Sequence, residues 1–297
     1  MYNITLGDID IGQQVSHRGI NFDFKEKTLQ IRSSTHDKFE KRLQCNQGTW
    51  GEWRSLFSML TYGAQILGVP LCEFFHINKF WAKHTDVNPK LSIQLWEATE
   101  DEFQRVAAVV LANQKVSPAV IHNTGCILFT DARLDDEGAI IAGILICEGT
   151  GHHLMFTRKL NDFDSDINVL EAYALEYALH IWSTQLKHTC TTYLTDNTAT
   201  LATLEHMHSR SYKLNAVVGH VYNQLMAMDT QLLLMWIPSA HNPADAPTRG
   251  DPFTHDHLNV LSWATQNSLR SSDLVEEGKY SFPLLYTNSM SHWCGKE

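Results

Sequence analysis

The sequence predicts an α/β fold, a mixed five-stranded sheet with helices, preceded by a smaller region made of a hairpin and helices. Three short apolar runs follow one another within 125–160, separated by turns rich in Asp and Gly, and predict consecutive antiparallel strands. A long helical pattern over 168–186 precedes a fourth strand-like run, and a fifth follows after further helical stretches. A helical crossover of this kind returns the chain to a parallel strand beside the first, so the sheet is mixed.

The first 120 residues predict the smaller region. Residues 15–32 alternate apolar and polar side chains around Gly19 and predict a two-stranded hairpin. Residues 49–115 place apolar side chains at helical spacing. A break is expected near Pro118, because proline biases the residue before it away from helical backbone geometry.

The remaining chain predicts the sheet and an extension. The five strand-like runs are, in order, GCILFTDA, GAIIAGILIC, HHLMFTRKL, TTYLTD and QLLLMWIP. Helical stretches occupy about 198–208 and 213–228, and the loop SAHNPADAPTRG follows the last strand. We therefore expect a first domain over 1–120, a sheet domain over 121–250 and a C-terminal extension over 251–297.

Composition restricts the class of protein. Hydrophobic residues make up 43% of the 297 residues and charged residues 19%, which is typical of a folded, globular chain. The six cysteines form no C-x-x-C pair, which excludes a disulfide scaffold or a zinc ribbon and suits a reducing compartment. The N-terminus has no secretory signal pattern, and no apolar run reaches the roughly 20 residues of a membrane span. We expect a soluble intracellular protein, without a distinction among cytoplasm, nucleus and organelle.

The charge is unevenly distributed along the chain. Residues 1–120 hold 13 Lys and Arg against 13 Asp and Glu, so the formal net charge of −10 belongs entirely to 121–297. A general nucleic-acid binder is usually basic, because neutralising phosphates supplies most of its affinity. The local exception is Lys25–Arg42, with six basic and three acidic residues, which is either a solvated helix face or a phosphate contact.

Two acids end strand-like runs. Asp131 follows the apolar run CILFT and Asp196 follows TTYLT, positions where a charge is costly unless it is exposed or liganded. If the crossover makes these strands neighbours, both carboxylates emerge at the same sheet edge, where open α/β sheets bind ligands. The alternative for Asp196 is an ordinary helix N-cap, since Asn197, Thr198 and a helical stretch follow it.

Two further acids lie at a helix start and in a loop after a strand. Glu171 shares a helical stripe with Ala174 and Leu175, the face that is expected to pack on the sheet, and a bound cation would relieve the cost of burying its charge. The alternative for Glu171 is a capping box with Asn168. Asp245 lies in the proline-flanked loop NPADAP, where the alternative is a turn or a helix cap.

The joint placement of these four acids indicates a metal site. Four carboxylates at one sheet edge form a hard oxygen site that suits Mg²⁺ or Mn²⁺. Two such ions, about 3.5–4 Å apart, activate water and stabilise the leaving oxygen in phosphodiester hydrolysis. The acidic charge of the second half is then explained, because the acids are metal ligands whose mutual repulsion is relieved by cations.

Four sequence blocks resemble those of retroelement ribonuclease H domains. The blocks are Phe129-Thr130-Asp131-Ala132, Asn168-Val169-Leu170-Glu171, Leu194-Thr195-Asp196-Asn197-Thr198, and Trp236-Ile237-Pro238-Ser239 with Asn242-Pro243-Ala244-Asp245-Ala246-Pro247-Thr248-Arg249. The last block follows the pattern W-I-P-S-x-x-N-P-A-D-x-P-S/T-R, which is typical of gypsy-like and tyrosine-recombinase-type retrotransposon polyproteins. Together the blocks cover about 125–250.

The resemblance implies a ribonuclease H-like fold and a two-metal endoribonuclease that cleaves the RNA strand of an RNA–DNA hybrid. The implied ligands of two Mg²⁺ or Mn²⁺ ions are Asp131, Glu171, Asp196 and Asp245. His241, four residues before Asp245, is expected to assist product release as a mobile proton carrier. Candidate contacts with the nucleic acid, through the 2′-hydroxyls in the minor groove, are Arg133, Asn197, Thr198 and Arg249.

The N-terminal half resembles part of a reverse transcriptase. The segment His17-Arg18-Gly19-Ile20-x-Phe22-Asp23 is similar to the hairpin that follows the polymerase active site, and 53–80 is similar to the thumb helices. No Y-x-D-D motif precedes the hairpin. The chain therefore looks like the thumb and connection region of a reverse transcriptase joined to its ribonuclease H domain, without polymerase activity.

Two other functions compete with the enzyme. One is a domesticated, non-catalytic ribonuclease H-like subunit that binds or scaffolds a ribonucleoprotein complex, with other polyprotein-derived or ribonucleoprotein subunits as partners and no membrane. The other is an integrase or transposase with the same core, which needs a glutamate about 35 residues after the second aspartate. No glutamate lies between Glu205 and Glu276, so the integrase hypothesis is disfavoured.

Overall fold

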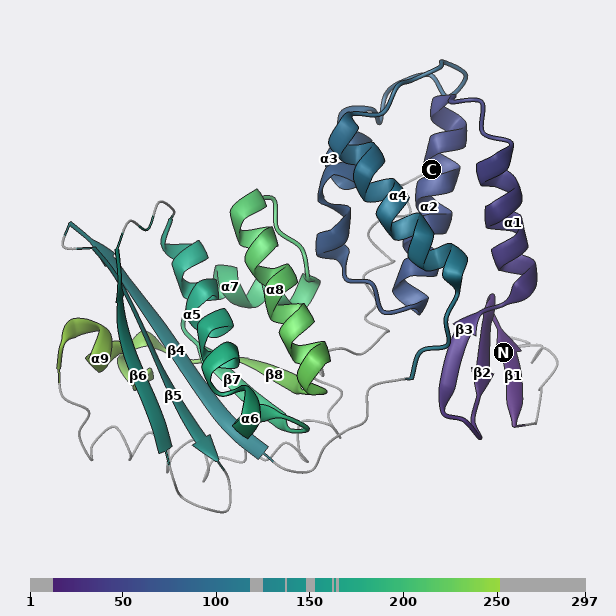
Figure 1. Cartoon of the computed structure of the whole chain (residues 1–297). Helices are drawn as coiled ribbons and strands as arrows, with labels where there is room; N and C mark the ends of the chain where they lie inside the picture. The colour runs from purple at the N-terminus through teal and green to yellow at the C-terminus, as the bar shows by residue number, and fades with distance from the viewer. Residues whose placement is uncertain are drawn as a thin grey trace, which may run out of the picture. The chain divides into compact units, whose positions relative to one another are not determined.

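The structure, a computed structural model, describes residues 13–117, 125–136, 138–147, 153–161, 163 and 166–251 (Figure 1). The chain divides into two compact units, Met1–Pro118 and Ala119–Glu297, and each unit is described by itself. The extension expected over 251–297 lies outside the described residues except for Asp251. Among the described residues, no helix combines the length and hydropathy of a membrane span.

The first unit contains a three-stranded antiparallel sheet where the sequence predicted a two-stranded hairpin. Its strands are β1 (Gln14–His17), β2 (Ile20–Asp23) and β3 (Thr28–Ile31). Arg18 and Gly19 both have positive φ angles, 46° and 81°, as a two-residue type I′ hairpin turn requires. The alternating segment before Phe24 is therefore two strands joined by a tight turn, because Gly19 adopts this backbone conformation without strain.

Helices follow the sheet in the described part of the first unit. They are α1 (Ser33–Gln44), α2 (Trp50–Ile66), the short 3₁₀ helix η1 (Leu71–Phe74), α3 (Phe75–Lys83) and α4 (Glu97–Ala112). A capping box begins α2: the Thr49 side chain accepts from the Glu52 backbone, and the Glu52 carboxylate accepts from the Thr49 N–H. In α1 the only buried side chain is Phe39, so the part of the basic stretch Lys25–Arg42 that lies in this helix is mostly exposed. Its contact with phosphate stays a prediction.

Aromatic side chains build the core of these helices. Trp50, Phe57, Phe80 and Phe103 are fully buried and contact one another largely edge to face. The buried Glu102 carboxylate accepts from the backbone N–H groups of His76 and Ile77, at 2.8 and 3.0 Å. This carboxylate therefore has a structural role, because it satisfies the free N–H groups at the start of α3.

The second unit contains the predicted five-stranded mixed sheet, with strand order β6-β5-β4-β7-β8. The strands are β4 (Gly125–Asp135), β5 (Gly138–Cys147), β6 (His153–Leu160), β7 (Cys190–Thr195) and β8 (Gln231–Trp236). The first three pair antiparallel, and β7 lies parallel to both β4 and β8. This topology confirms the α/β prediction and the ribonuclease H-like fold, in which the crossover places β7 beside β4.

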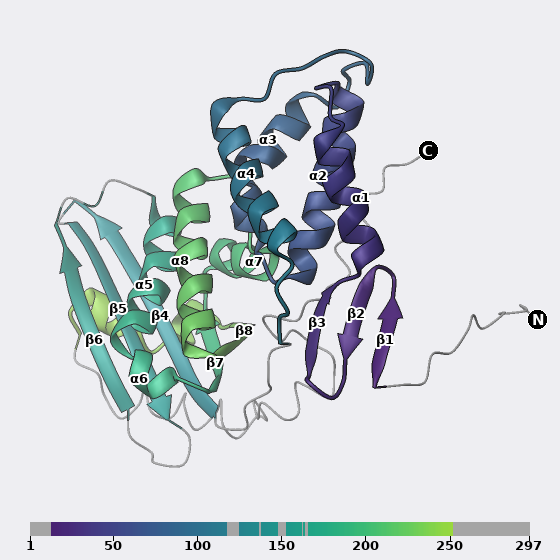
Figure 2. The ribbon, with the colours of Figure 1, turned by 45° about the vertical axis from the view of Figure 1, so that its right-hand side comes forward.

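Helices of the second unit are α5 (Ile167–Ile181), α6 (Ser183–Leu186), α7 (Thr198–His206), α8 (Tyr212–Met228), the 3₁₀ helix η2 (Ser239–His241) and α9 (Asp245–Arg249). Figures 1 and 2 show α5 and α8 side by side over one face of the sheet, and Leu175, Val218 and Leu128 share their buried core. In a smaller apolar cluster, strand residues such as Phe129 and Leu194 pack against Ile237 and Ala244 of the segment that follows β8. That segment is thereby held against the sheet near the strand ends.

Candidate metal centre

Three of the four predicted acids meet in the second unit. Asp131 of β4, Glu171 of α5 and Asp196, directly after β7, each offer one carboxylate oxygen, and these oxygens lie within 4.8 Å of one another. Asp131 and Glu171 are each only 5% exposed, and Asp196 is half-buried. Side chains from three separate elements therefore form one acidic cluster, which we call the carboxylate triad.

The parallel register explains why two of these acids meet. Phe129 of β4 pairs with Leu194 of β7, so Asp131 and Asp196, each two residues later, leave adjacent strands at the same level. The sequence placed Asp131 at the end of its strand, and this detail is wrong. Strand β4 continues to Asp135, because its last residues still pair with β5.

Neither Asp196 nor Glu171 has the helix-capping role that the sequence left open. Asn197 caps α7, and its side chain accepts from the Thr200 N–H at 2.8 Å, so Asp196 is not the cap. Asp166 caps α5, which puts Glu171 beyond the first turn and outside a capping box with Asn168. Both carboxylates are therefore available to a ligand.

Burial and like charges disfavour ionisation within the triad. Burial raises the pKa of Glu171 to about 9, and Asp131 and Asp196 add to this shift while the Ala132 backbone N–H opposes it. Burial also raises the pKa of Asp131 to about 6, against a hydrogen bond from Thr248, and the charges of Asp196 and Asp245 contribute. Without a bound cation, burial and mutual repulsion therefore disfavour negative charge on the triad.

A divalent cation fits this environment. Within the described part of the chain, the buried Oε2 atom of Glu171 has no hydrogen-bond partner, although unpaired buried polar atoms are costly. Carboxylate oxygens are the ligands that Mg²⁺ and Mn²⁺ prefer. A cation bound by the triad would pair this oxygen and relieve the repulsion among the three acids.

The fourth predicted ligand, Asp245, stands beside the triad with a different partner. Its carboxylate Oδ1 accepts from both Nε and Nη2 of Arg249, each at 2.9 Å, in the first turn of α9. Its charge still contributes to the raised pKa values of Asp131 and Glu171. Asp245 is therefore near the triad and paired with Arg249.

Polar residues that the sequence did not single out hold the triad in place. The buried Asn242 side-chain amide donates to the Thr130 carbonyl at 2.9 Å and to Asp196 Oδ1 at 3.3 Å. The Thr248 hydroxyl lies 2.6 Å from Asp131 Oδ2. Both residues fall in the last family-like block, but only their contacts, made with strands far away in the sequence, show what they do.

The predicted nucleic-acid contacts have varied environments. Arg133 pairs with Asp135 at 2.5 Å, and the Asn197 amide donates to Asn168 Oδ1 at 3.1 Å, while Thr198 is exposed at the start of α7. His241 is exposed in η2, four residues before Asp245. Their roles toward substrate, and that of Arg249, stay predictions.

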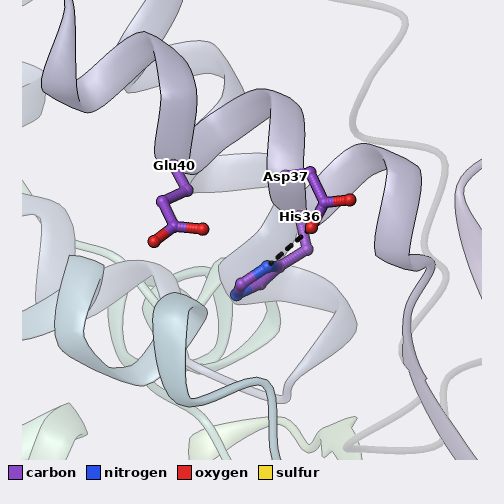
Figure 3. A group of neighbouring side chains, drawn as sticks. All are labelled: His36, Asp37 and Glu40. Carbon is purple, nitrogen blue, oxygen red and sulfur yellow. Dashed lines mark ion pairs between the residues drawn. The ribbon is translucent and has the colours of Figure 1, made fainter.

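A second group of potential ligands lies on α1 in the first unit. Figure 3 shows His36, Asp37 and Glu40, whose ligand atoms also lie within 4.8 Å of one another. Asp37 and Glu40 are exposed, and the ring of His36 contacts the Leu111 carbonyl at 2.9 Å and Asp37 at 3.7 Å. Solvated surface carboxylates need no ion, so we assign no metal to this group.

No protein-family model and no curated protein matches the chain, whereas solved structures do. The N-terminal RNase H domain of Rv2228c from Mycobacterium tuberculosis is 12% identical over 48% of this chain and 99% of its own, with a TM-score of 0.37. RNase H1 from Halobacterium salinarum is 16% identical over 46% of this chain and 97% of its own, with a TM-score of 0.35. A foamy viral protease-reverse transcriptase in complex with double-stranded DNA is 9% identical over 76% of this chain and 38% of its own, with a TM-score of 0.29. Similarities at these identities and TM-scores do not indicate the activity of this chain. Its fold is assigned from the strand order β6-β5-β4-β7-β8.

Proposed function

We propose that this chain is a two-metal ribonuclease H that cleaves the RNA strand of RNA–DNA hybrids. The observation that carries the proposal is the carboxylate triad: three acids from β4, α5 and the end of β7, within 4.8 Å, with one buried oxygen unpaired. Clusters of carboxylates on divalent ions are suited to in-line displacement at phosphate. The resemblance of the four sequence blocks to retroelement ribonuclease H domains supplies the substrate class.

Each site residue has a defined role in this proposal. Asp131, Glu171 and Asp196 hold the cations, with Asp245 as the fourth ligand, and the ions supply water activation and stabilisation of the leaving oxygen. Because the pKa of Glu171 is about 9, its carboxyl is mostly protonated at neutral pH, and cation binding releases that proton. The pairing of Asp245 with Arg249 competes with metal binding by Asp245.

The proposal also assigns contacts with the substrate. Arg133, Asn197, Thr198 and Arg249 contact the backbone or 2′-hydroxyls of the hybrid, and His241 carries a proton away as product leaves. A local set of polar and basic groups is needed because the second half of the chain is acidic as a whole. Cations at the triad reduce that negative charge where phosphate approaches.

A cleavage assay tests the proposed function. The full chain is incubated with end-labelled RNA–DNA hybrid, double-stranded RNA and single-stranded RNA, with Mg²⁺, with Mn²⁺ or with a chelator. Cleavage of the hybrid alone, dependent on the metal and lost in Asp131→Asn and Glu171→Gln, supports the proposal. Tight hybrid binding without cleavage contradicts it and favours the non-catalytic ribonucleoprotein subunit.

The first unit extends the proposal to the origin of the chain. A hairpin, β1–β2, followed by helices is the order of elements expected from the resemblance of this region to a reverse-transcriptase hairpin and thumb, and it supports the proposal. We therefore infer that the chain derives from a gypsy-like or tyrosine-recombinase-type retroelement polyprotein. The W-I-P-S…N-P-A-D block, which supplies Asp245, is the most specific support for this origin.

A further inference from the structure

Thr248 links α9, the last described helix of the second unit, to the triad. The residue lies in α9, three positions after Asp245, and is 1% exposed. Its hydroxyl reaches Asp131 Oδ2 at 2.6 Å, across 117 positions of sequence. The same hydroxyl lies 2.7 Å from the Asp245 backbone carbonyl. One buried side chain therefore contacts one predicted ligand directly and the backbone of another.

The hydroxyl cannot make a linear hydrogen bond to both acceptors at once, because it carries a single proton. When Asp131 is ionised, its carboxylate is the stronger acceptor, since hydrogen bonds to charged groups are shorter and stronger than neutral ones. A contact of 2.6 Å is typical of such a bond. Oδ2 of Asp131 then accepts from Thr248, which leaves Oδ1 as the less engaged oxygen toward a cation.

We infer that Thr248 is a positioning residue for the metal centre, which fixes the rotation of the Asp131 carboxylate and thereby the oxygen that Asp131 offers. This inference rests on the proposed metal site. Groups that hydrogen-bond to metal ligands typically change metal affinity or activity by about 10–100-fold when they are lost. Thr248 is therefore expected to affect cation affinity without contacting the cation.

Thr203 of α7 provides a matched control for the loss of a buried helical hydroxyl. Thr203 is also buried, and its hydroxyl donates to the Ala199 carbonyl at 2.8 Å, a local bond like that of Thr248 with Asp245. Among the described residues, the Thr203 hydroxyl makes no hydrogen bond with a carboxylate. Thr203→Val thus removes a buried helical hydroxyl alone, whereas Thr248→Val also removes the contact with Asp131.

The test measures Mn²⁺ binding to the full chain by calorimetric titration, for the wild type, Thr248→Val, Thr248→Ser and Thr203→Val. We expect Thr248→Val to raise the Mn²⁺ dissociation constant by about 10–100-fold, which is weaker binding. Thr248→Ser keeps the donor and should bind close to wild type, as should Thr203→Val. If Thr248→Val does not fold, Thr248→Ala removes the same donor from a smaller side chain.

The outcomes separate this inference from the proposed function. Unchanged Mn²⁺ affinity in a folded Thr248→Val or Thr248→Ala protein overturns the inference, and so does an equal loss in Thr248→Ser or Thr203→Val. Mn²⁺ binding by the wild type without hybrid cleavage overturns the proposed function and leaves the role of Thr248 to be decided by the titrations. A wild type that binds no Mn²⁺ overturns both.

Discussion

Among single side chains, Glu171 shows most directly how the fold creates a reactive environment. It stands on the buried face of α5, where apolar packing would normally exclude a carboxyl group. Its Oε2 atom has no hydrogen-bond partner among the described residues, and the pKa of the group is about 9. A side chain in this state destabilises the metal-free protein when it ionises and gains most from a bound cation.

The raised pKa of Glu171 predicts how metal-free stability depends on pH. The folded protein keeps the Glu171 proton up to about pH 9, while an unfolded chain loses it near the ordinary value of 4.5. Between these limits the folded state binds more protons, so stability is highest below the unfolded pKa and falls as pH rises toward 9. Glu171→Gln removes this ionisation, and its urea-unfolding free energy in chelator should change less between pH 5 and 9. Parallel pH curves for the two proteins would contradict the assignment.

Asp196→Asn separates metal binding from helix capping. Since Asn197 is the cap of α7, the substitution should leave metal-free stability unchanged or slightly higher, because it removes one of several repelling charges. It should reduce the rise in melting temperature caused by Mn²⁺, because a cation stabilises only through its affinity for the folded state. Hybrid cleavage should fall by orders of magnitude. Thermal melts with and without Mn²⁺ check the first two results; an undiminished Mn²⁺ response with full cleavage would exclude Asp196 as a ligand.

At the scale of elements, the segment from Ile237 through α9 makes varied contacts with the sheet and the triad. Its Asn242 side chain hydrogen-bonds to Thr130 and Asp196, and its Thr248 hydroxyl hydrogen-bonds to Asp131. Its Ile237 and Ala244 side chains belong to the apolar cluster on the sheet. Helix α9 has only five residues and would not form alone, since isolated short helices are unstable in water. Tertiary contacts therefore hold this segment, and the same contacts orient the triad.

The centre of strand β5 offers a test of packing behind the site. Gly143 faces Phe156 of β6, and a Cβ at position 143 would lie 2.4 Å from the Phe156 ring. The ring cannot move freely, because Tyr177 and Trp182 contact it at centroid distances of 5.0 and 5.3 Å. Gly143→Ala should therefore cost about 1–3 kcal/mol of unfolding free energy in urea. Gly143→Ala with Phe156→Leu should recover part of this loss, and a stable single variant would show that the ring yields easily.

For the chain as a whole, the two units differ in charge and in proposed task. The first is neutral in sum and packs an aromatic core, whereas the formal charge of −10 falls on 121–297 with the triad. Cations at the triad offset only part of that charge, so nucleic-acid affinity should depend strongly on the divalent ion. The acidic second unit is therefore consistent with a metal-dependent site rather than with a general binder.

Primer extension tests the proposed origin of the first unit. The 297 residues contain no Y-x-D-D motif, whose carboxylates hold the metals of a polymerase, so this chain should not incorporate nucleotides on RNA or DNA templates. The assay uses the full chain with primed templates, Mg²⁺ or Mn²⁺ and a reverse transcriptase as positive control. Template-dependent incorporation would contradict the interpretation of residues 1–120.

The sequence by itself determined most of the second unit. Apolar runs, helical spacing and turn residues are local signals, and they predicted the five strands, the crossover helix and the mixed sheet. The same local patterns selected Asp131, Glu171 and Asp196, because an acid on an otherwise apolar strand or helix face stands out without knowledge of its neighbours. In the first unit the local signal was incomplete: the Arg18-Gly19 turn made three strands where two were predicted.

Only the tertiary structure decided which atoms meet. Whether Asp196 caps a helix, where β4 ends, and whether Asp245 pairs with Arg249 depend on backbone geometry and register. The hydrogen bonds of Thr248 and Asn242 join residues 117 and 46 positions apart, and no local pattern encodes such contacts. Their formation depends on the packing of the whole sheet, since the strands that carry Asp131 and Asp196 become neighbours only when the α5 crossover folds between them.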